Sequence, residues 1–315
     1  MTAQRVVCIV GPTACHKTEA SILLAKAIDS EIVSADSVAV YRGLDIGSAK
    51  PTIEERAGVP HHMIDVAEIT DVDFTVARFR EEARRAIDDI LRRGKTPIVV
   101  GGSGLYSDAI FSDMRFSVPS DSTVRAALED EYQRNPEAVF ARLRAADSIT
   151  AARLHPNDAK RVVRALEVFQ ISGRPFSAWN RDFESVQTQA DGYQVIRFGL
   201  TMDRAALYDR IDRRVDGMFD RGLLAEAFAL FDRGLTPDRY PAMQSIGYAQ
   251  LYEVYTGQCS LSEAREAIKR STRHFAKRQL TWFRRNTKTK WFAADAPDSI
   301  LSIVAAWTKE IQSTE

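Results

Sequence analysis

The sequence has few cysteines and no long apolar run. Cys8, Cys15 and Cys259 are scattered and form no C-x-x-C pair, which argues against a disulfide framework or a structural zinc site. No apolar run approaches the roughly 18 residues that a membrane-spanning helix needs. A candidate phosphate-binding loop begins at residue 11, which leaves no room for a cleavable leader before it. These absences predict a cytoplasmic protein that is not embedded in a membrane.

Net charge is also missing. The 43 basic and 43 acidic side chains cancel, a balance that neither supports nor excludes a nucleic-acid partner, because a local patch decides that. With 315 residues and 45% hydrophobic side chains, the chain has the size and composition of one large or two modest globular domains with a core.

One stretch lacks acidic residues altogether. No Asp or Glu lies between residues 267 and 294, and aromatic residues alternate there with basic ones. An ordinary solvated helix face mixes both signs of charge, so this stretch favours a surface for a phosphate backbone. A second basic cluster lies at 160–164. Two separate basic surfaces suit a folded RNA better than a small metabolite. The basic residues of the first stretch are Lys269, Arg270, Arg273, Lys277, Arg278, Arg284, Arg285, Lys288 and Lys290.

The segment GPTACHKT at 11–18 follows an apolar run and precedes a helical pattern. It matches the phosphate-loop pattern G-x-x-x-x-G-K-[ST] except that His16 replaces the second glycine. Loop amides and a helix N-terminus favour an anion, Lys17 adds a full charge, and Thr18 offers a hydroxyl to Mg²⁺. His16 brings a Cβ and a titratable ring. The loop must therefore tolerate a strained residue or change its geometry.

Two further polar segments follow predicted strands. Asp36 lies in a Ser-Ala-Asp-Ser turn after residues 31–33, and Ser103 lies in a Gly-Gly-Ser-Gly segment after residues 97–100. In a parallel sheet both belong at the same edge as the phosphate loop, so we expect the three segments to converge. Asp36 is either a functional carboxylate, as a general base or a Mg²⁺ partner, or simply an Asx turn. The pair His61-His62 has no partner at ligand spacing and predicts no metal site.

Strand and helix patterns alternate up to about residue 112, and the strand signal then disappears until residue 193. This predicts an α/β core, built from 1–118 and 192–315 with C-terminal helices, and a helical insertion at 119–191. Helical patterns cover 18–28, 79–93, 124–134, 137–146, 159–171, 204–221, 223–233, 243–255 and 262–285, followed by one amphipathic helix in the tail.

Several blocks, in order, resemble the tRNA dimethylallyltransferase (tRNA isopentenyltransferase) family. They are GPTACHKT, SADSVAVYRGLDIGSAKPT, GVPHHMIDV, PIVVGGSGLY, HPNDAKRVVRALEVFQISG, MQSIGY and AKRQLTWFRR. The resemblance implies a P-loop nucleoside-kinase-like parallel sheet with a helical insertion that contacts tRNA. It also implies transfer of a dimethylallyl group from dimethylallyl diphosphate to N6 of adenosine-37 next to the anticodon, with Mg²⁺. We expect a monomer.

The resemblance carries roles over to individual positions. Catalysis falls to Lys17, Asp36 and Ser103, with Asp36 as the general base. Donor binding falls to Gly11, Thr13, Ala14, Cys15, His16, Lys17, Thr18, Arg210 and Arg214, and the metal to Thr18. Contact with the tRNA anticodon stem-loop falls to Asp36, Ser37, Val38, Ala39, Ser103, Arg125, Lys160, Arg161, Arg164, Gln244, Gly247, Tyr248, Lys277, Arg278, Gln279, Trp282 and Arg284.

The sequence departs from the family at Cys15-His16, where Ser-Gly is usual, at Ala39, where glutamine is common, and at Ser103, where threonine is usual. Three alternatives therefore stay open. One is an isopentenyltransferase that acts on AMP or ADP and does not need the basic stretch. Another is a tRNA-binding paralogue whose catalysis is impaired by His16. The third is a small-metabolite kinase.

Overall fold

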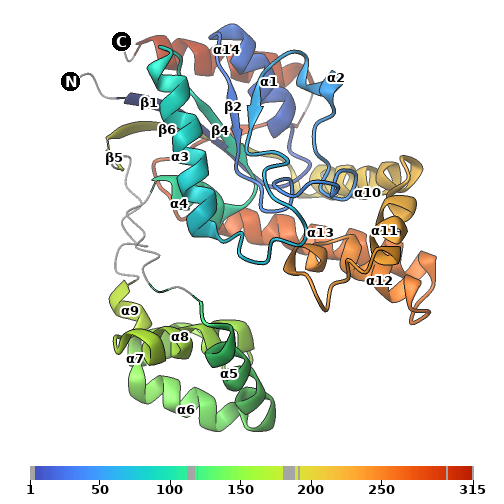
Figure 1. Ribbon diagram of the computed structural model, residues 1–315. Coiled ribbons are helices and arrows are strands. Elements are labelled where there is room, and N and C mark those ends of the chain that lie inside the picture. The colour runs from blue at the N-terminus through green and yellow to red at the C-terminus, as the bar shows by residue number, and fades with distance from the viewer. Residues whose placement is uncertain are drawn as a thin grey trace. The chain divides into compact units, whose positions relative to one another are not determined.

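The computed structural model describes residues 4–111, 118, 120–179, 189–190, 192–295 and 297–313 (Figure 1). The chain divides into two compact units, one of Met1–Phe111 with Gln187–Glu315 and the other of Ser112–Val186. The boundaries expected from the sequence fall at residues 119 and 191, which lie outside the described residues. Within the described residues, no helix combines the length and apolar character needed to cross a membrane.

The first unit is built on a sheet in the order β3-β2-β4-β1-β6-β5, with β7 also paired to β6. Every pairing is parallel except that of β5 with β6. The predicted α/β fold with a parallel sheet is therefore confirmed. The strands are β1 (Gln4–Val10), β2 (Ile32–Ser34), β3 (His61–His62), β4 (Ile98–Gly101), β5 (Gln189–Ala190), β6 (Tyr193–Thr201) and β7 (Lys290–Ala293).

Helices cover both faces of β1, which explains why this strand is apolar at successive positions. Val6, Cys8 and Val10 belong to a core that includes α3 (Val76–Arg92). The alternate residues Val7 and Ile9 belong to a second core that includes α1 (Lys17–Ala27) and α14 (Pro297–Ser313). Successive side chains of a strand point to opposite faces, so each core receives every second residue.

Most of the remaining helices of this unit come from the C-terminal half of the chain (Figure 1). Helices α10, α11, α12 and α13 pack in sequence, each on the next, and α10 also packs on α13. These helices and the shorter ones are α2 (Ile53–Arg56), α4 (Gly104–Phe111), α10 (Arg204–Asp220), α11 (Leu223–Asp232), the 3₁₀ helix η2 (Pro241–Gln244), α12 (Tyr248–Tyr255) and α13 (Leu261–Phe283).

The second unit is helical and has its own apolar core, which includes Leu128, Leu143 and Leu166. Its core is separate from the two cores that cover the sheet. Its helices are α5 (Ser122–Arg134), α6 (Pro136–Ala146), α7 (Ser148–Arg153), α8 (Ala159–Ser172) and α9 (Phe176–Trp179).

Two predicted elements differ from the structure. The pattern over 243–255 predicts one helix, but Ser245 is extended, with φ −66° and ψ 153°, so η2 ends there and α12 begins only at Tyr248. Residues 290–293 were expected to be part of the tail, but they form β7 on the edge of β6. Strand β7 is only four residues long, too short for a clear pattern.

Candidate active site

The phosphate loop turns from β1 into α1 without a capping side chain. His16 is the N-cap residue and its side chain makes no capping hydrogen bond. The first N–H groups of a helix have no partner within the helix, so an uncapped end offers them to an anion. At the start of the loop Gly11 has a φ of 150°, and a Cβ there would lie 2.5 Å from the carbonyl oxygen of Leu200. Only glycine allows this close approach to β6.

His16 takes the left-handed conformation that glycine adopts most freely, with φ 54° and ψ 16°. This conformation costs a residue with a Cβ about 1–2 kcal/mol. The His16 Nδ1 atom lies 2.9 Å from Oε2 of Glu19, a contact that holds the ring beside the first turn of α1. His16 is therefore a residue with a Cβ held in a strained backbone conformation, as one of the two outcomes expected from the sequence requires.

Two cations are bonded to carbonyl oxygens of the loop. Lys17 Nζ donates to the carbonyl of Pro12 at 2.6 Å, and Arg210 Nε donates to that of Ala14 at 3.0 Å. Arg210 comes from α10, far along the chain, so the structure brings the predicted donor-binding residues together. Neither cation has an acidic partner within ion-pair distance among the described residues, so both charges are available to an anion.

Burial destabilises the charged forms of the cations at this site. Desolvation lowers the pKa of Lys17 to about 8. It also lowers the pKa of Arg214, whose Nη1 lies 3.5 Å from the Thr13 hydroxyl. Desolvation raises the pKa of Cys15 to about 11, so this thiol stays protonated. A bound anion would offset the desolvation of the cations, and such clustering is typical of a functional site.

Asp36 makes the Asx turn that was one of the two possibilities left open by the sequence, and it does so with only one of its two oxygens. Its Oδ1 atom accepts hydrogen bonds from the N–H groups of Val38 at 2.8 Å and Ala39 at 3.1 Å, which makes an Asx turn. Its Oδ2 atom has no hydrogen bond within the part of the chain that the structure describes. One oxygen therefore builds the turn, and the other is available for a ligand or a proton.

Ser103 is tied to the same turn. Its Oγ atom accepts a hydrogen bond from the N–H of Ser37 at 3.0 Å and lies 3.1 Å from the Ser37 hydroxyl. This contact joins the segment after β4 to the segment after β2. The convergence predicted for the phosphate loop, Asp36 and Ser103 is confirmed, since all three line one cleft of about 1690 Å³. Tyr106 lines the same cleft, and burial raises the pKa of its phenol above the usual range.

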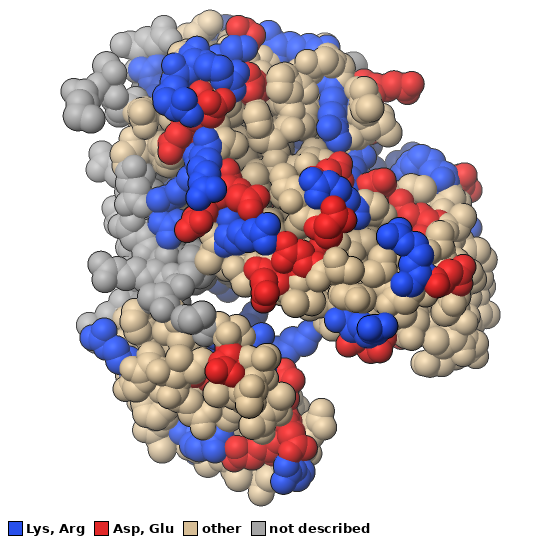
Figure 2. All heavy atoms as spheres, viewed as in Figure 1, with Lys and Arg blue, Asp and Glu red and all other residues tan. Residues whose placement is uncertain are grey.

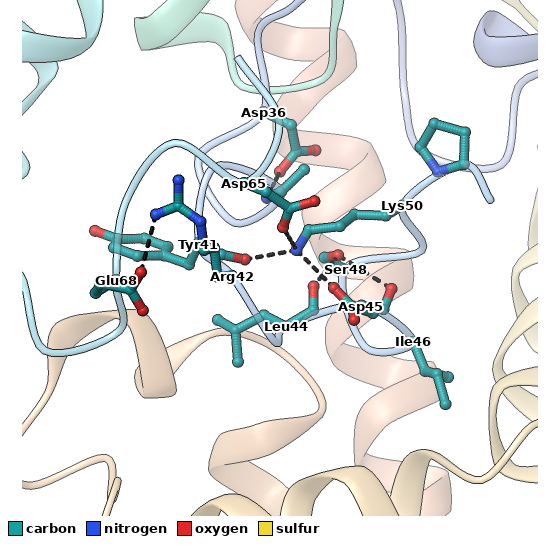
Figure 3. Close-up of polar contacts among 12 residues, drawn as sticks. Asp36, Tyr41, Arg42, Leu44, Asp45, Ile46, Ser48, Lys50, Asp65 and Glu68 are labelled. Carbon is teal, nitrogen blue, oxygen red and sulfur yellow. Dashed lines mark hydrogen bonds and ion pairs between the residues drawn. The ribbon is translucent and has the colours of Figure 1, made fainter. Parts of the chain in front are cut away.

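Lys50 holds one wall of the cleft. Its ammonium donates to the Tyr41 carbonyl at 2.5 Å, to Asp45 at 2.7 Å and to Asp65 at 2.6 Å (Figure 3). The Lys50 side chain is only 5% exposed. These bonds hold together the segment between β2 and β3 and tie it to Asp65, which follows β3. No local signal in the sequence assigns Lys50 this task.

Glu226 of α11 holds the same wall from the other side. Its carboxylate accepts hydrogen bonds from the successive N–H groups of Asp45, Ile46 and Gly47. The Tyr248 hydroxyl donates to the same carboxylate at 2.5 Å. No local pattern in the sequence indicates this role, because Glu226 accepts hydrogen bonds from residues about 180 positions away.

A model of the IPP transferase family matches residues 39–286 of this chain. The chain belongs to the IPP transferase family. It is 46% identical over 292 residues to a tRNA dimethylallyltransferase of Geobacillus kaustophilus, which covers 92% of this chain and 90% of that protein. It is also 46% identical to a tRNA dimethylallyltransferase of Geobacter metallireducens, with 95% and 96% covered.

Two solved structures extend this likeness to the fold. A full-length tRNA isopentenylpyrophosphate transferase from Bacillus halodurans is 39% identical, with a TM-score of 0.72 and coverage of 98% of this chain and 97% of that one. A eukaryotic dimethylallyltransferase acting on tRNA is 29% identical, with a TM-score of 0.78 and coverage of 93% and 74%. These likenesses confirm the resemblance stated from the sequence motifs.

In this IPP transferase the basic stretch of α13 divides into two sets. Lys269 pairs with Asp216 at 2.8 Å and Arg273 pairs with Asp212 at 2.6 Å, so these two cations bind α13 to α10. This corrects the prediction that they belong to an RNA surface. Asp212 and Asp216 come from α10, so the local sequence of α13 could not reveal them, although Lys269 also lies 3.4 Å from Glu266 of α13 itself. A second set is exposed and has no ion pair within the described residues: Arg270, Lys277, Arg278, Arg284 and Arg285.

Several predicted RNA contacts of this IPP transferase are buried. Tyr248 has no exposed surface, and Gln279 is 5% exposed. Both side chains make internal hydrogen bonds, so these two assignments are corrected to internal roles. Ala39 and Gly247 are also buried, at the wall of the cleft. Trp282 is half-buried, and its indole N–H donates to Asp108 at 2.7 Å.

The helical unit holds the other predicted RNA contacts. Arg125 and Arg164 each donate to the buried carboxylate of Glu167 at 2.8 Å. Burial alone would raise the pKa of Glu167, but hydrogen bonds from these arginines more than offset it, so the pKa lies below its usual range. Lys160 and Arg161 are exposed at the start of α8. Arg125 and Arg164 therefore stabilise the unit itself, and Arg161 pairs with Asp158 of the same unit at 3.3 Å.

Charge over the molecule is otherwise mixed. On the face drawn in Figure 2, Lys and Arg side chains are interspersed with Asp and Glu side chains.

Gln244 is exposed and donates to the carbonyl of Pro237 at 3.1 Å. The carboxylate of Glu31 accepts a hydrogen bond from Nε2 of His62 at 2.8 Å, a structural contact. Among the described residues no group of three or more His, Cys, Asp or Glu side chains could hold a metal ion.

Proposed function

We propose that this protein transfers a dimethylallyl group from dimethylallyl diphosphate to N6 of adenosine-37 in tRNA. The observation that carries the proposal is one cleft that joins an uncapped phosphate loop to the free oxygen of Asp36. The loop alone would suit any phosphate ester. A carboxylate in the same cleft adds the group that a proton-bearing nucleophile needs.

In the proposed reaction the adenine N6 forms a bond to C1 of the donor while the bond from C1 to the diphosphate oxygen breaks. The leaving diphosphate takes the electron pair of that bond. Lys17, Arg210, Arg214 and the amides at the start of α1 stabilise the negative charge that develops on it. Asp36 Oδ2 takes the proton from N6, because an exocyclic adenine amine is a poor nucleophile until it loses one. Ser103, through its bonds to Ser37, positions the turn that holds Asp36.

We propose Mg²⁺ as the companion of the diphosphate. The Thr18 hydroxyl is exposed at the start of α1 and has no hydrogen-bond partner among the described residues, and hydroxyl oxygen suits a hard cation. Mg²⁺ in proteins commonly takes few side-chain ligands and completes its shell with phosphate oxygens and water. Bound there, the ion would neutralise charge on the leaving group.

The acceptor is proposed to enter as an unstacked base of the anticodon loop. The phosphate loop lines a cleft of the first unit, so an adenine must leave its stack to reach the loop. The exposed cations of α13, with Lys160 and Arg161 of α8, supply charge for the backbone phosphates. We also propose a monomer, and tRNA as the substrate supports a cytoplasmic location.

Mass spectrometry tests the function directly. The purified protein is incubated with an unmodified tRNA that carries adenosine-37, dimethylallyl diphosphate and Mg²⁺, and the nucleosides are then analysed. We expect N6-(dimethylallyl)adenosine and no product when guanosine replaces adenosine-37. A parallel reaction with AMP separates this function from an adenylate isopentenyltransferase. Efficient prenylation of AMP with no prenylation of tRNA would overturn the proposal.

A further inference from the structure

Gln279 lies on the helix that carries the basic surface but faces the opposite way. Its neighbours Lys277 and Arg278 are exposed, whereas its own side chain is 5% exposed. A buried amide must find partners for both of its polar atoms. The partners of Gln279 are therefore informative about its task.

Both partners line the cleft. The Gln279 Oε1 atom accepts a hydrogen bond from the N–H of Thr13 at 2.8 Å. The Nε2 atom donates to the carbonyl of Gly102 at 2.9 Å. A Cβ at Gly102 would lie 2.3 Å from Nε2, so this glycine gives the amide room. One side chain thus ties α13 to the phosphate loop and to the segment that carries Ser103.

Thr13 is held from a second helix as well. Arg214 of α10 approaches its hydroxyl at 3.5 Å. Helix α10 is itself bound to α13 through the pairs Asp212–Arg273 and Asp216–Lys269. The loop residue Thr13 therefore sits between two helices that are joined to each other, and a shift of α13 would move its backbone N–H.

We propose that Gln279 is a positioning residue that couples tRNA binding on α13 to diphosphate binding in the phosphate loop. This inference rests on the proposed function. RNA on the exposed side of α13 and diphosphate in the loop both stabilise the arrangement in which the Gln279 bonds are made. Each ligand then raises the affinity for the other by the same factor, because binding free energies are reciprocally linked.

The test measures binding without turnover. The dissociation constant of an anticodon stem-loop is measured with and without magnesium diphosphate, for the natural protein and for Gln279→Ala. We expect diphosphate to tighten RNA binding about 5-fold or more in the natural protein, and hardly at all in Gln279→Ala. In Gln279→Glu the carboxylate keeps an acceptor for Thr13 but loses the donor to Gly102, so the factor should be intermediate. This variant carries the test if Gln279→Ala fails to fold.

Lys277→Gln is the matched control, because it lies two residues away on the same helix and its side chain is exposed. It should weaken RNA binding equally with and without diphosphate. The inference would be overturned if diphosphate tightened RNA binding equally in the Gln279 variants and the natural protein. It would also be overturned if diphosphate did not tighten RNA binding in the natural protein. Prenylation of tRNA is scored separately in the natural protein. Coupling without prenylation would contradict the proposed function alone, and prenylation without coupling would contradict this inference alone.

Discussion

Cations have opposite surroundings at the phosphate loop and in the helical unit. At the loop, Lys17, Arg210 and Arg214 are bonded to neutral oxygens and have no ion pair among the described residues. In the helical unit, Arg125 and Arg164 share the carboxylate of Glu167, which has no exposed surface. The first group keeps its charge for a ligand, and the second uses its charge to stabilise the fold.

Helix α13 shows both situations within one element. Lys269 and Arg273 are paired with acidic residues of α10, while Lys277 and Arg278 are exposed and unpaired within the described residues. Basic residues alone therefore do not define a binding surface. The acidic residues that neutralise them must be located first, and these often come from another element.

The largest effect is expected from Asp36→Asn. The amide oxygen can still accept the hydrogen bonds of Val38 and Ala39 that Oδ1 accepts now, so the turn should keep its shape. The base is lost, and turnover should fall about 10²–10⁴-fold, measured as the single-turnover rate. Affinity for tRNA and for dimethylallyl diphosphate should change little, and a matching loss of both affinities would show that the carboxylate only shapes the site.

Lys17→Gln should rank next, because it removes an unpaired cation from the leaving-group site. We expect kcat/KM for the donor to fall about 10²–10³-fold, as for loss of one charge-stabilising group. The same residue predicts a pH dependence. Its pKa of about 8 means that the ammonium loses its proton as the pH rises through 8, so kcat/KM should fall above that pH.

Lys17→Arg is the control for this pH dependence. The guanidinium keeps its charge throughout the range, so the variant should be slower but should lose the decline above pH 8. A decline that persists in Lys17→Arg would assign the pH dependence to another group. A value of kcat/KM that rises as the pH passes through 8 in the natural protein would also contradict the role of the ammonium.

The paired and unpaired arginines offer the sharpest test of the comparison itself. Arg278→Gln should weaken tRNA binding a few-fold and reduce the salt dependence of log Kd by about 0.7–0.9 per log unit of salt. Arg125→Gln should instead lower the free energy of unfolding by about 1 kcal/mol, a modest value because its side chain is 39% exposed and screened. Urea unfolding and binding at several salt concentrations measure the two effects. Equal loss of RNA affinity in both variants would contradict the distinction between ion-paired and exposed arginines.

His16→Gly should have the smallest effect. Glycine adopts the left-handed conformation freely, but it also gives the unfolded chain more freedom, so stability should rise by no more than about 1 kcal/mol. Donor KM should fall slightly. His16→Ala separates backbone from ring, because it keeps the Cβ and removes the contact with Glu19. A large gain in turnover in His16→Gly would instead show that the histidine impairs catalysis.

The sequence predicted those features that depend on nearby residues. Strands with continuous apolar runs, such as β1, are apolar because both faces are covered, and this pattern is local. The loop after β1, the turn at Asp36 and the segment at Ser103 could be placed together because parallel strands end at one edge of a sheet. The family motifs then supplied the reaction.

Features that depend on distant partners could not be predicted. Gln279 lies in a run of exposed basic residues, and only the fold shows that its amide reaches Thr13. The role of Glu226 could not be predicted for the same reason. Its partners are three backbone N–H groups of a distant segment, and nothing near Glu226 in the sequence indicates them. Burial of Tyr248 follows from that same contact.

The bond between Gln279 and Thr13 also constrains how the protein is made. The two residues are 266 positions apart, so the ribosome synthesises the phosphate loop long before the side chain that holds it. At about 5–20 residues per second, the loop waits on the order of ten seconds or more for its partner. During that interval the helical unit, which has its own core, can fold. The nascent chain therefore completes its active site among its last steps.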